Sequence, residues 1–167
     1  SAEDILNQPS LNSPRAKVII RLISKVVEAA HVAQPELMPV LVCLGIDSCL
    51  DEGNSPLSSF LYSWYGVLLC SESKGILQGQ KMGDLALRLL KKYPSKEIHT
   101  RVITLIEHLI RPWQTHIKYS LAPLKKNYQL GLDHGDSEYA ALSACLYSLH
   151  AYLAGHNLNN LATKVGL

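Results

Sequence analysis

Residues 55–70 read SPLSSFLYSWYGVLLC, a serine and a proline followed by a run of mostly apolar side chains. Serine is favoured just before a helix because its side-chain oxygen accepts a hydrogen bond from a free backbone N–H. Proline is favoured at the first helical position, where its missing N–H costs nothing. The stretch therefore predicts a helix from Pro56 to about Cys70, and the apolar spacing predicts its buried face. That face comprises Leu57, Phe60, Leu61, Trp64, Leu68 and Tyr65.

The same kind of opening occurs four times along the chain. Ser13-Pro14, Ser55-Pro56, Ser95-Lys96 and Asp136-Ser137 are separated by 42, 40 and 41 residues. A regular period of this length is typical of a repeat protein in which each unit is a pair of helices. The period predicts an all-α fold: a right-handed stack of antiparallel helical hairpins, a tetratricopeptide-like α-solenoid of about 7–8 helices.

The openings also predict the domain organisation. We expect residues 1–13 to be a flexible N-terminal segment and residues 14–167 to be one helical-repeat domain, with pairs at about 14–51, 55–93, 95–134 and 136–167. Only about eleven residues follow the turn at Gly155, so the last pair is expected to lack most of its second helix. We therefore expect the chain to be a piece of a longer protein.

Three local patterns refine this prediction. The first helix carries a wide apolar stripe that is expected to be buried, and the fourth pair carries a similar one. The members are Val18, Ile19, Leu22, Ile23, Val26, Val27 and Ala30 in the first, and Tyr139, Leu142, Leu146, Leu149 and Leu153 in the second. In the third pair, the apolar stripe from Trp113 to Leu132 continues through Pro123, which predicts one helix kinked at that proline.

Composition and charge limit the classes of function. The chain is 47% hydrophobic and 18% charged, and no apolar run reaches the about 20 residues of a membrane span. The N-terminus does not resemble a secretory signal. A net charge of +2 is too small to indicate nucleic-acid binding. We therefore expect a cytoplasmic protein that binds neither membrane nor nucleic acid. Its four cysteines, in apolar stretches and without a C-x-x-C pair, are expected to be reduced core thiols.

Several stretches together resemble one region of a known family. They are Pro35-Glu36-Leu37-Met38-Pro39, Gly53-Asn54-Ser55-Pro56, Tyr65-Gly66-Val67-Leu68-Leu69-Cys70, Gly83-Asp84-Leu85-Ala86-Leu87, Arg111-Pro112-Trp113 and Gly131-Leu132-Asp133-His134-Gly135-Asp136-Ser137-Glu138-Tyr139-Ala140. The family comprises very large signalling proteins of cyanobacteria and some fungi. These proteins join a serine/threonine kinase-like domain, a predicted NTPase, a helical region, a GAF sensor domain and a histidine kinase. The resemblance spans residues 14–161 and implies that this chain is the helical region following the NTPase.

The chain departs from the family pattern in two places. Residues 71–77 lack the usual glycine-aspartate turn, and Gln114 and Thr115 replace a more charged, proline-containing stretch. The resemblance implies a regulatory scaffold that binds protein, either neighbouring domains of the same parent chain or a signalling partner. The alternative is a free-standing adaptor that binds peptides.

Catalytic motifs are missing from the sequence. It has no G-x-x-x-x-G-K-[ST] phosphate loop, H-R-D catalytic loop or D-F-G motif. We therefore expect this chain not to be an enzyme and to need no cofactor, although the implied parent would be a protein kinase and ATPase. The seven histidines leave open a third alternative, a helical hydrolase or metal-binding protein, but neither His99 and His108 nor His108 and His116 have a metal-ligand spacing.

A small set of aromatic and histidine residues is the candidate partner-binding site. It comprises Trp113, Tyr119, Tyr147 and His150. Aromatic side chains dominate interface energetics, but core packing also explains Trp64 and Trp113, and an ordinary packed histidine also explains His150. Glu107 and Arg111, four residues apart on one helix, are expected to be a surface ion pair with no functional meaning.

Overall fold

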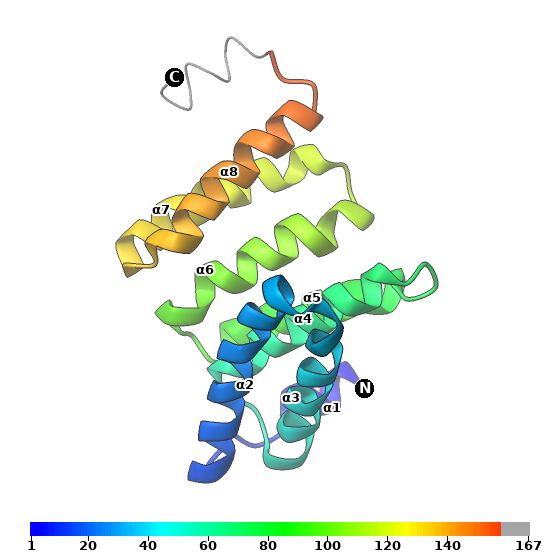
Figure 1. The fold of residues 1–167 in the computed structure, drawn as a ribbon, viewed down its shortest axis with the longest axis vertical. Helices are drawn as coiled ribbons and strands as arrows, with labels where there is room; N and C mark the ends of the chain where they lie inside the picture. The colour runs from blue at the N-terminus through cyan, green and yellow to red at the C-terminus, as the bar shows by residue number, and fades with distance from the viewer. Residues whose placement is uncertain (158–167) are drawn as a thin grey trace.

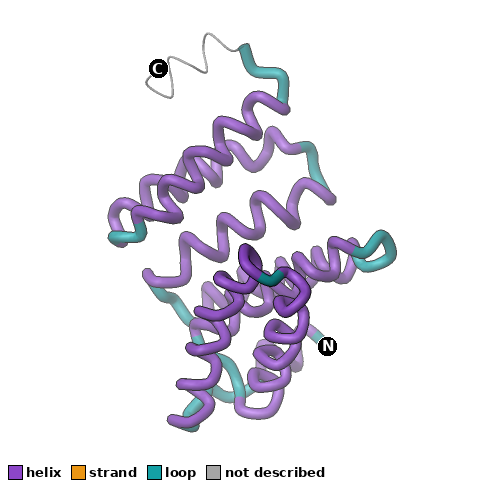
Figure 2. Tube along the Cα trace, in the orientation of Figure 1, coloured by secondary structure: helices purple, strands orange, loops and turns teal. Residues whose placement is uncertain are grey.

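The structure, a computed structural model, describes residues 1–157 and is all-helical over that range (Figures 1 and 2). The α-helices are α1 (Ala2–Asn7), α2 (Pro14–Ala33), α3 (Met38–Glu52), α4 (Pro56–Ser71), α5 (Ile76–Lys92), α6 (Lys96–Leu105), α7 (Leu121–His134) and α8 (Ser137–Leu153). Short 3-10 turns lie at Pro35–Leu37, Arg111–Trp113 and Ile117–Ser120, and a π-helical turn lies at Ile106–Ile110.

The predicted helix openings are confirmed. Helices α2, α4, α6 and α8 start directly after Ser13, Ser55, Ser95 and Asp136, and the side chains of Ser13 and Asp136 accept hydrogen bonds from backbone N–H groups of the first turn. Helix α2 packs against α3 and α4 against α5, as expected for the first two pairs. Helix α6 contacts its expected partner α7, but α7 packs more extensively against α8, which the period assigns to the next pair.

The centre of the fold is the tight pair α4 and α5. Gly66 of α4 faces Gly79 and Gly83 of α5, and a Cβ on Gly79 would lie 2.6 Å from the Gly66 carbonyl oxygen. Side chains larger than hydrogen would separate the two helices. The predicted α4 face is buried at Phe60, Leu61 and Trp64, and these residues join the hydrophobic core.

The N-terminal segment, expected to be flexible and to precede the helical domain, contains a helix that packs onto that domain. Residues 2–7 form α1, which Ser1 caps and which packs against α5. Arg88 of α5 pairs with Glu3 at 2.8 Å, and Leu6 and Leu11 are buried in the core. The segment is therefore part of the helical domain, because two apolar side chains and an ion pair attach it.

The expected buried stripe of α2 is only partly correct, since Val27 and Ala30 are buried but Ile19 and Val26 are each 38% exposed. The buried residues of α2 are Ala16, Ile20, Ser24, Val27 and Ala30, whereas Val18 and Leu22 are 68% and 63% exposed. The helix is apolar over more of its circumference than its neighbours cover. An apolar row on α2 therefore remains uncovered in the described chain.

The expected kinked helix through Pro123 does not form. Trp113 ends a 3-10 turn, residues 114–116 separate it from the next turn, and α7 begins only at Leu121. Pro123 therefore lies in the first turn of α7, where a missing N–H is tolerated. The preceding helix α6 continues instead into the π-helical turn Ile106–Ile110.

Helix α8, the first helix of the last predicted pair, is covered by neighbouring helices on one side. Tyr139 and Leu146 of α8 are buried as expected, but Leu142, Leu149 and Leu153 are between 41% and 58% exposed. The expected inward stripe is therefore only partly correct, because α6 and α7 cover one side of α8. The predicted second helix of this pair, from about Asn157, lies almost wholly outside the described residues.

The cysteine prediction is half correct. Cys49 and Cys70 are buried and Cys43 and Cys145 are exposed, all four as free thiols. None of the helices in the described part of the chain has the length and apolar character that crossing a bilayer requires.

Candidate functional site

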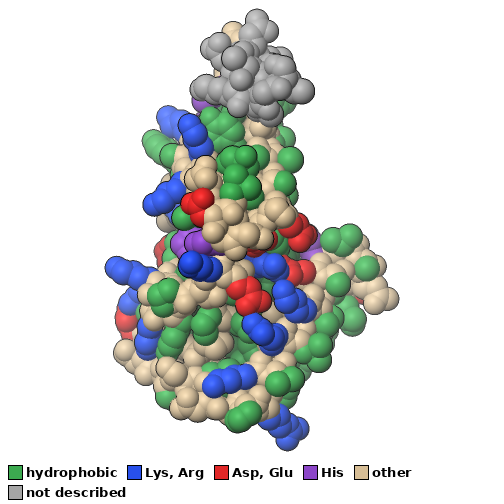
Figure 3. Space-filling model, turned by 90° about the vertical axis from the view of Figure 1, so that its left-hand side faces the viewer, with side chains coloured by type: hydrophobic (Ala, Val, Ile, Leu, Met, Phe, Trp, Pro, Cys, Tyr) green, Lys and Arg blue, Asp and Glu red, His purple; other side chains and the backbone are tan. Residues whose placement is uncertain are grey.

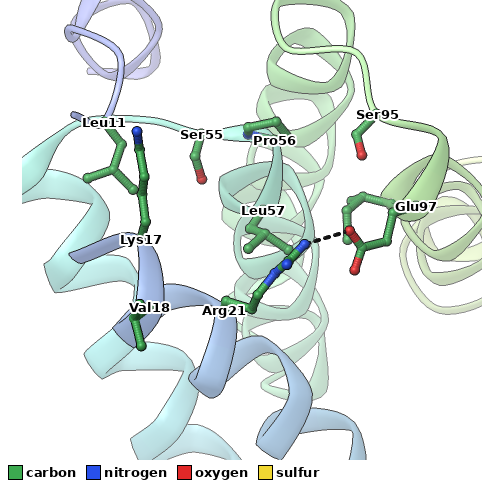
Figure 4. Close-up of a pocket in the computed structure, with 10 residues that line it drawn as sticks. Leu11, Lys17, Val18, Arg21, Ser55, Pro56, Leu57, Ser95 and Glu97 are labelled. Carbon is green, nitrogen blue, oxygen red and sulfur yellow. Dashed lines mark hydrogen bonds and ion pairs between the residues drawn. The ribbon is translucent and has the colours of Figure 1, made fainter. Parts of the chain in front are cut away.

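An open groove of about 480 Å³ lies where three helices begin (Figure 4). Its walls are Lys17, Val18 and Arg21 from α2 together with residues at the starts of α4 and α6. The latter are Ser55, Pro56 and Leu57 at α4, and Ser95, Glu97 and Ile98 at α6, with Leu11 at one end. The volume lies within the about 300–1,000 Å³ of ligand-binding clefts.

The repeat places these walls together. The starts of α4 and α6, after Ser55 and Ser95, lie beside the first two turns of α2 along one edge of the fold (Figure 4). The groove follows that edge and combines apolar side chains with the positive ends of the α4 and α6 dipoles.

The charges at the groove are predominantly basic. Arg21 reaches across it to Glu97, with 2.9 Å between Nη2 and Oε2, and Lys25 approaches the same carboxylate at 3.8 Å. The Lys17 ammonium makes no ion pair or hydrogen bond within the described residues. All these groups are well exposed, so water screens the pairs, which contribute at most about 1 kcal/mol each.

The uncovered apolar row of α2 runs beside this groove. Val18, Leu22 and Val26 follow a helical spacing of four, and Val18 itself lines the groove. Figure 3 shows Lys, Arg, Asp and Glu side chains across the middle of the face seen from the left of Figure 1, with hydrophobic side chains among them. The groove and the row meet at Val18, and Lys17 and Arg21 of the groove lie beside the row on the same helix.

A half-buried ionic cluster connects α2 to α6 and α8. Arg101 of α6 contacts both oxygens of Glu28 at 2.8 Å, and Tyr139 of α8 donates a hydrogen bond to Glu28 at 2.7 Å. Asp136 lies 3.5 Å from the Arg101 Nε. The burial of Tyr139 and its bond to Glu28 raise the pKa of the phenol, so it stays a donor. The cluster fixes α2 relative to α6 and α8.

The four residues predicted for partner binding do not share one environment. Trp113 and Tyr119 are 57% and 60% exposed on the 3-10 turns between α6 and α7, so Trp113 is not a core residue. Tyr147 is half-buried, and His150 is fully buried in α8. None of the four lines the groove.

His150 instead belongs to a buried hydrogen-bond chain. Its Nδ1 contacts the Ser120 Oγ, and its Nε2 lies 3.0 Å from Nδ1 of His108. The Ser120 hydroxyl donates its hydrogen to the Ile117 carbonyl oxygen, at 2.7 Å. Ser120 therefore accepts from Nδ1–H of His150, and Nδ1–H of His108 donates to Nε2 of His150.

This chain has the order serine, histidine, histidine, but its geometry is not that of an activated nucleophile. A general base must accept the serine hydrogen, and here that hydrogen is directed to a backbone carbonyl. Ser120 is also only 1% exposed. Burial lowers the pKa of His108 and of His150, and the repulsion that two charged rings would exert on each other lowers the pKa of His150 further. Both rings are therefore held neutral in a structural contact.

Sequence reasoning missed the histidine pair, although a signal existed. His108 and His150 are 42 residues apart, one more than the 41 residues between the openings at Ser95 and Asp136, so they occupy nearly equivalent positions in successive units. A search for histidine pairs within one helix does not find the contact between His108 and His150. A comparison of residues about one period apart does find it.

The Glu107–Arg111 pair is not a surface pair, contrary to expectation. Glu107 lies in the π-helical turn with its side chain 4% exposed, and Arg111 Nε is 2.8 Å from its carboxylate. Burial raises the pKa of Glu107, and Arg111 opposes the shift. Pro112 has no N–H to continue the α-helical ladder, which favours a changed helical period at this point.

Metal ligation has no support in the geometry of residues 1–157, where no group of three or more His, Cys, Asp or Glu side chains could hold an ion. No family model matches the chain, and neither a curated protein nor a solved structure is significantly similar to it. The groove and its apolar row are therefore the features from which we argue function.

Proposed function

We propose that this chain is a non-catalytic protein-interaction module that holds a segment of a partner protein in the groove beside α2. The observation that carries the proposal is the apolar row of Val18, Leu22 and Val26, which is exposed and continuous with the groove. Exposed apolar surface of this kind, bordered by polar residues, marks interaction sites in soluble proteins.

The repeat organisation supports the same function. Helix pairs that recur every 40–42 residues suit a tetratricopeptide-like, right-handed stack, whose first helices present one extended binding face. In this proposal the first helices are α2, α4, α6 and α8, and the groove lies on the face that three of them share.

The motif resemblance supplies the context. We propose that the module is a regulatory scaffold within a multidomain signalling kinase of the cytoplasm, between its NTPase and sensor-kinase parts. A segment bound on α2 would change how the flanking domains are held, by favouring one of two arrangements. In the alternative, a free-standing adaptor, the same groove binds a peptide from a separate protein.

The size of the native protein distinguishes these two contexts. An antibody raised against this chain would detect a band many times larger than 18.4 kDa if the module is internal to a kinase. A band at 18.4 kDa would identify the adaptor.

Substitution in the native gene tests the proposed function. V18D/L22D places two carboxylates on the apolar row at positions that are already exposed, so folding is preserved. L77D on α5, 60% exposed and outside the groove, is the matched control. We expect V18D/L22D to change the kinase output or its control, and L77D to leave both unchanged. Unchanged output in both variants, with normal protein levels, would contradict the proposal.

A further inference from the structure

We propose, building on the function above, that the segment bound beside α2 is an acidic amphipathic helix. The proposal rests on two parallel rows of side chains on α2. One is the apolar row of Val18, Leu22 and Val26, and the other is a cationic row formed by Lys17, Arg21 and Lys25.

The spacing of the rows specifies a helical partner. Each row repeats every four residues, and each spans about 12 Å along α2 at the 1.5 Å rise of a helix. A helix that contributes apolar side chains at i, i+4 and i+7 matches such a row, as in other helix-in-groove complexes. The groove at the start of α2 receives the first apolar side chain beside Val18, Leu57 and Ile98.

The charge balance specifies an acidic partner. The carboxylates near the cationic row are Glu97 of α6 and Glu28 of α2 itself. Glu97 is shared by Arg21 and Lys25, Glu28 is engaged by Arg101, and Lys17 has no counter-charge among the described residues. The positive dipole ends at Ser55 and Ser95 add to the same potential. Partner carboxylates next to the apolar side chains would complete this arrangement.

Other occupants fit less well. Residues 158–167 of the chain carry Lys164 and no acidic side chain, so they do not complement the cationic row. A second copy could use its α3, which exposes Val40 and Leu44 near Asp47 and Asp51. Binding of that face to α2 would be head-to-tail and would extend into open chains. Such self-association is one outcome of the test.

Two designed peptides of about 18 residues, or five helical turns, test the proposal. Both carry a row of leucines at helical spacing, and the neighbouring row is glutamate in one and lysine in the other. Titration of the fluorescently labelled peptides with the full chain, followed by anisotropy, gives the dissociation constants. We expect the glutamate peptide to bind at least about tenfold more tightly at low salt, and the difference to shrink as salt is added.

Charge reversal locates the binding. R21E/K25E is expected to weaken binding of the glutamate peptide roughly tenfold. K125E/K126E on α7 changes the net charge equally and is expected to leave binding within about twofold. K17E breaks no internal ion pair, so it separates loss of partner contact from any change in the fold.

Three results of the peptide titrations would overturn the proposal: equal binding of the two peptides, equal weakening by R21E/K25E and K125E/K126E, or no binding of either peptide. A fourth result would show that the occupant is a second copy and would also overturn it. That result is concentration-dependent self-association of the chain that D47K/D51K abolishes. Tighter binding of the lysine peptide that V18D/L22D abolishes would refute the acidic partner and leave the groove as an interaction site. If V18D/L22D in the native gene also leaves the kinase output and its control unchanged, both proposals are refuted.

Discussion

Asn127 of α7 offers the sharpest prediction about how the last helix pair is attached. Its side chain is buried between α6 and α8, and its Nδ2 lies within 3.0 Å of the Thr100 carbonyl oxygen, the Thr104 hydroxyl and the Ser143 hydroxyl. The carbonyl of Thr100 only accepts hydrogen bonds, so the amide must face it with its NH₂ group. An aspartate at position 127 would place a carboxylate oxygen against the carbonyl oxygen of Thr100, and neither atom can donate a hydrogen bond to the other.

The magnitude follows from this geometry. N127A removes two donated hydrogen bonds at about 1 kcal/mol each and leaves a small cavity. It creates no unpaired hydroxyl, because Thr104 and Ser143 donate to backbone carbonyls of their own helices. The Oδ1 of Asn127, which has no partner, is also removed. We expect a net loss of about 1–3 kcal/mol for N127A and about 3–5 kcal/mol for N127D, which buries a charge without a donor.

Urea denaturation followed by circular dichroism measures both free energies of unfolding. At about 2–4 °C per kcal/mol for a chain of this size, N127D would also lower the melting temperature by roughly 6–20 °C. N12D, an exposed asparagine before α2, is the matched control and is expected to change stability by less than about 0.5 kcal/mol. Wild-type stability of N127D would refute the described contact between α7 and Thr100.

Four further variants test three separate parts of the structure. Gly79→Ala would place a Cβ 2.6 Å from an α4 carbonyl oxygen and is expected to cost about 1–3 kcal/mol in urea denaturation; a wild-type midpoint would contradict the close helix contact. Since burial lowers the pKa of His108 and His150 below the usual 6.5, stability is expected to be full above that pH and to fall below it. His150→Asn should make the unfolding free energy less pH-dependent between about pH 7.5 and 5.5, and an unchanged pH profile would refute the neutral pair. Arg111→Ala leaves the Glu107 carboxylate buried and is expected to destabilise more than Glu107→Gln, by thermal denaturation; the reverse order would refute the assigned ion pair.

The starts of α2, α4, α6 and α8 were predictable from sequence because their signals are local. Ser13, Ser55, Ser95 and Asp136 cap helices through contacts with the next few residues, so their positions and the period of the openings are visible in the sequence. The start of α7 was not predicted, because the apolar stripe around Pro123 is compatible with both a kinked helix and a helix that begins at Leu121.

Which face of each helix is buried depends on packing between distant segments. Val18 and Leu22 satisfy the same apolar pattern as Val27, but only Val27 is covered by neighbouring helices. The sequence therefore predicted a buried stripe where the structure has an exposed one. This disagreement is informative, since an apolar side chain with no internal partner is a candidate for an external one.

The candidate site was missed for a similar reason. Trp113 and Tyr119 were selected as aromatic residues, and both are exposed away from the groove. The groove consists of ordinary residues that the repeat brings together, such as Lys17, Leu57 and Ile98. Identification of such a site requires the relative placement of three helix starts, which single-residue chemistry does not provide.

Photo-crosslinking tests the central claim most directly. A benzophenone side chain at position 18, and separately at position 77 as the control, would be introduced into the native protein and activated in the source cells. The account predicts a defined adduct from position 18, with the crosslinked peptide rich in acidic and leucine residues, and none from position 77. Identical adducts from both positions, or no adduct from position 18 in fully expressed protein, would contradict the assignment of α2 and its groove as the binding surface.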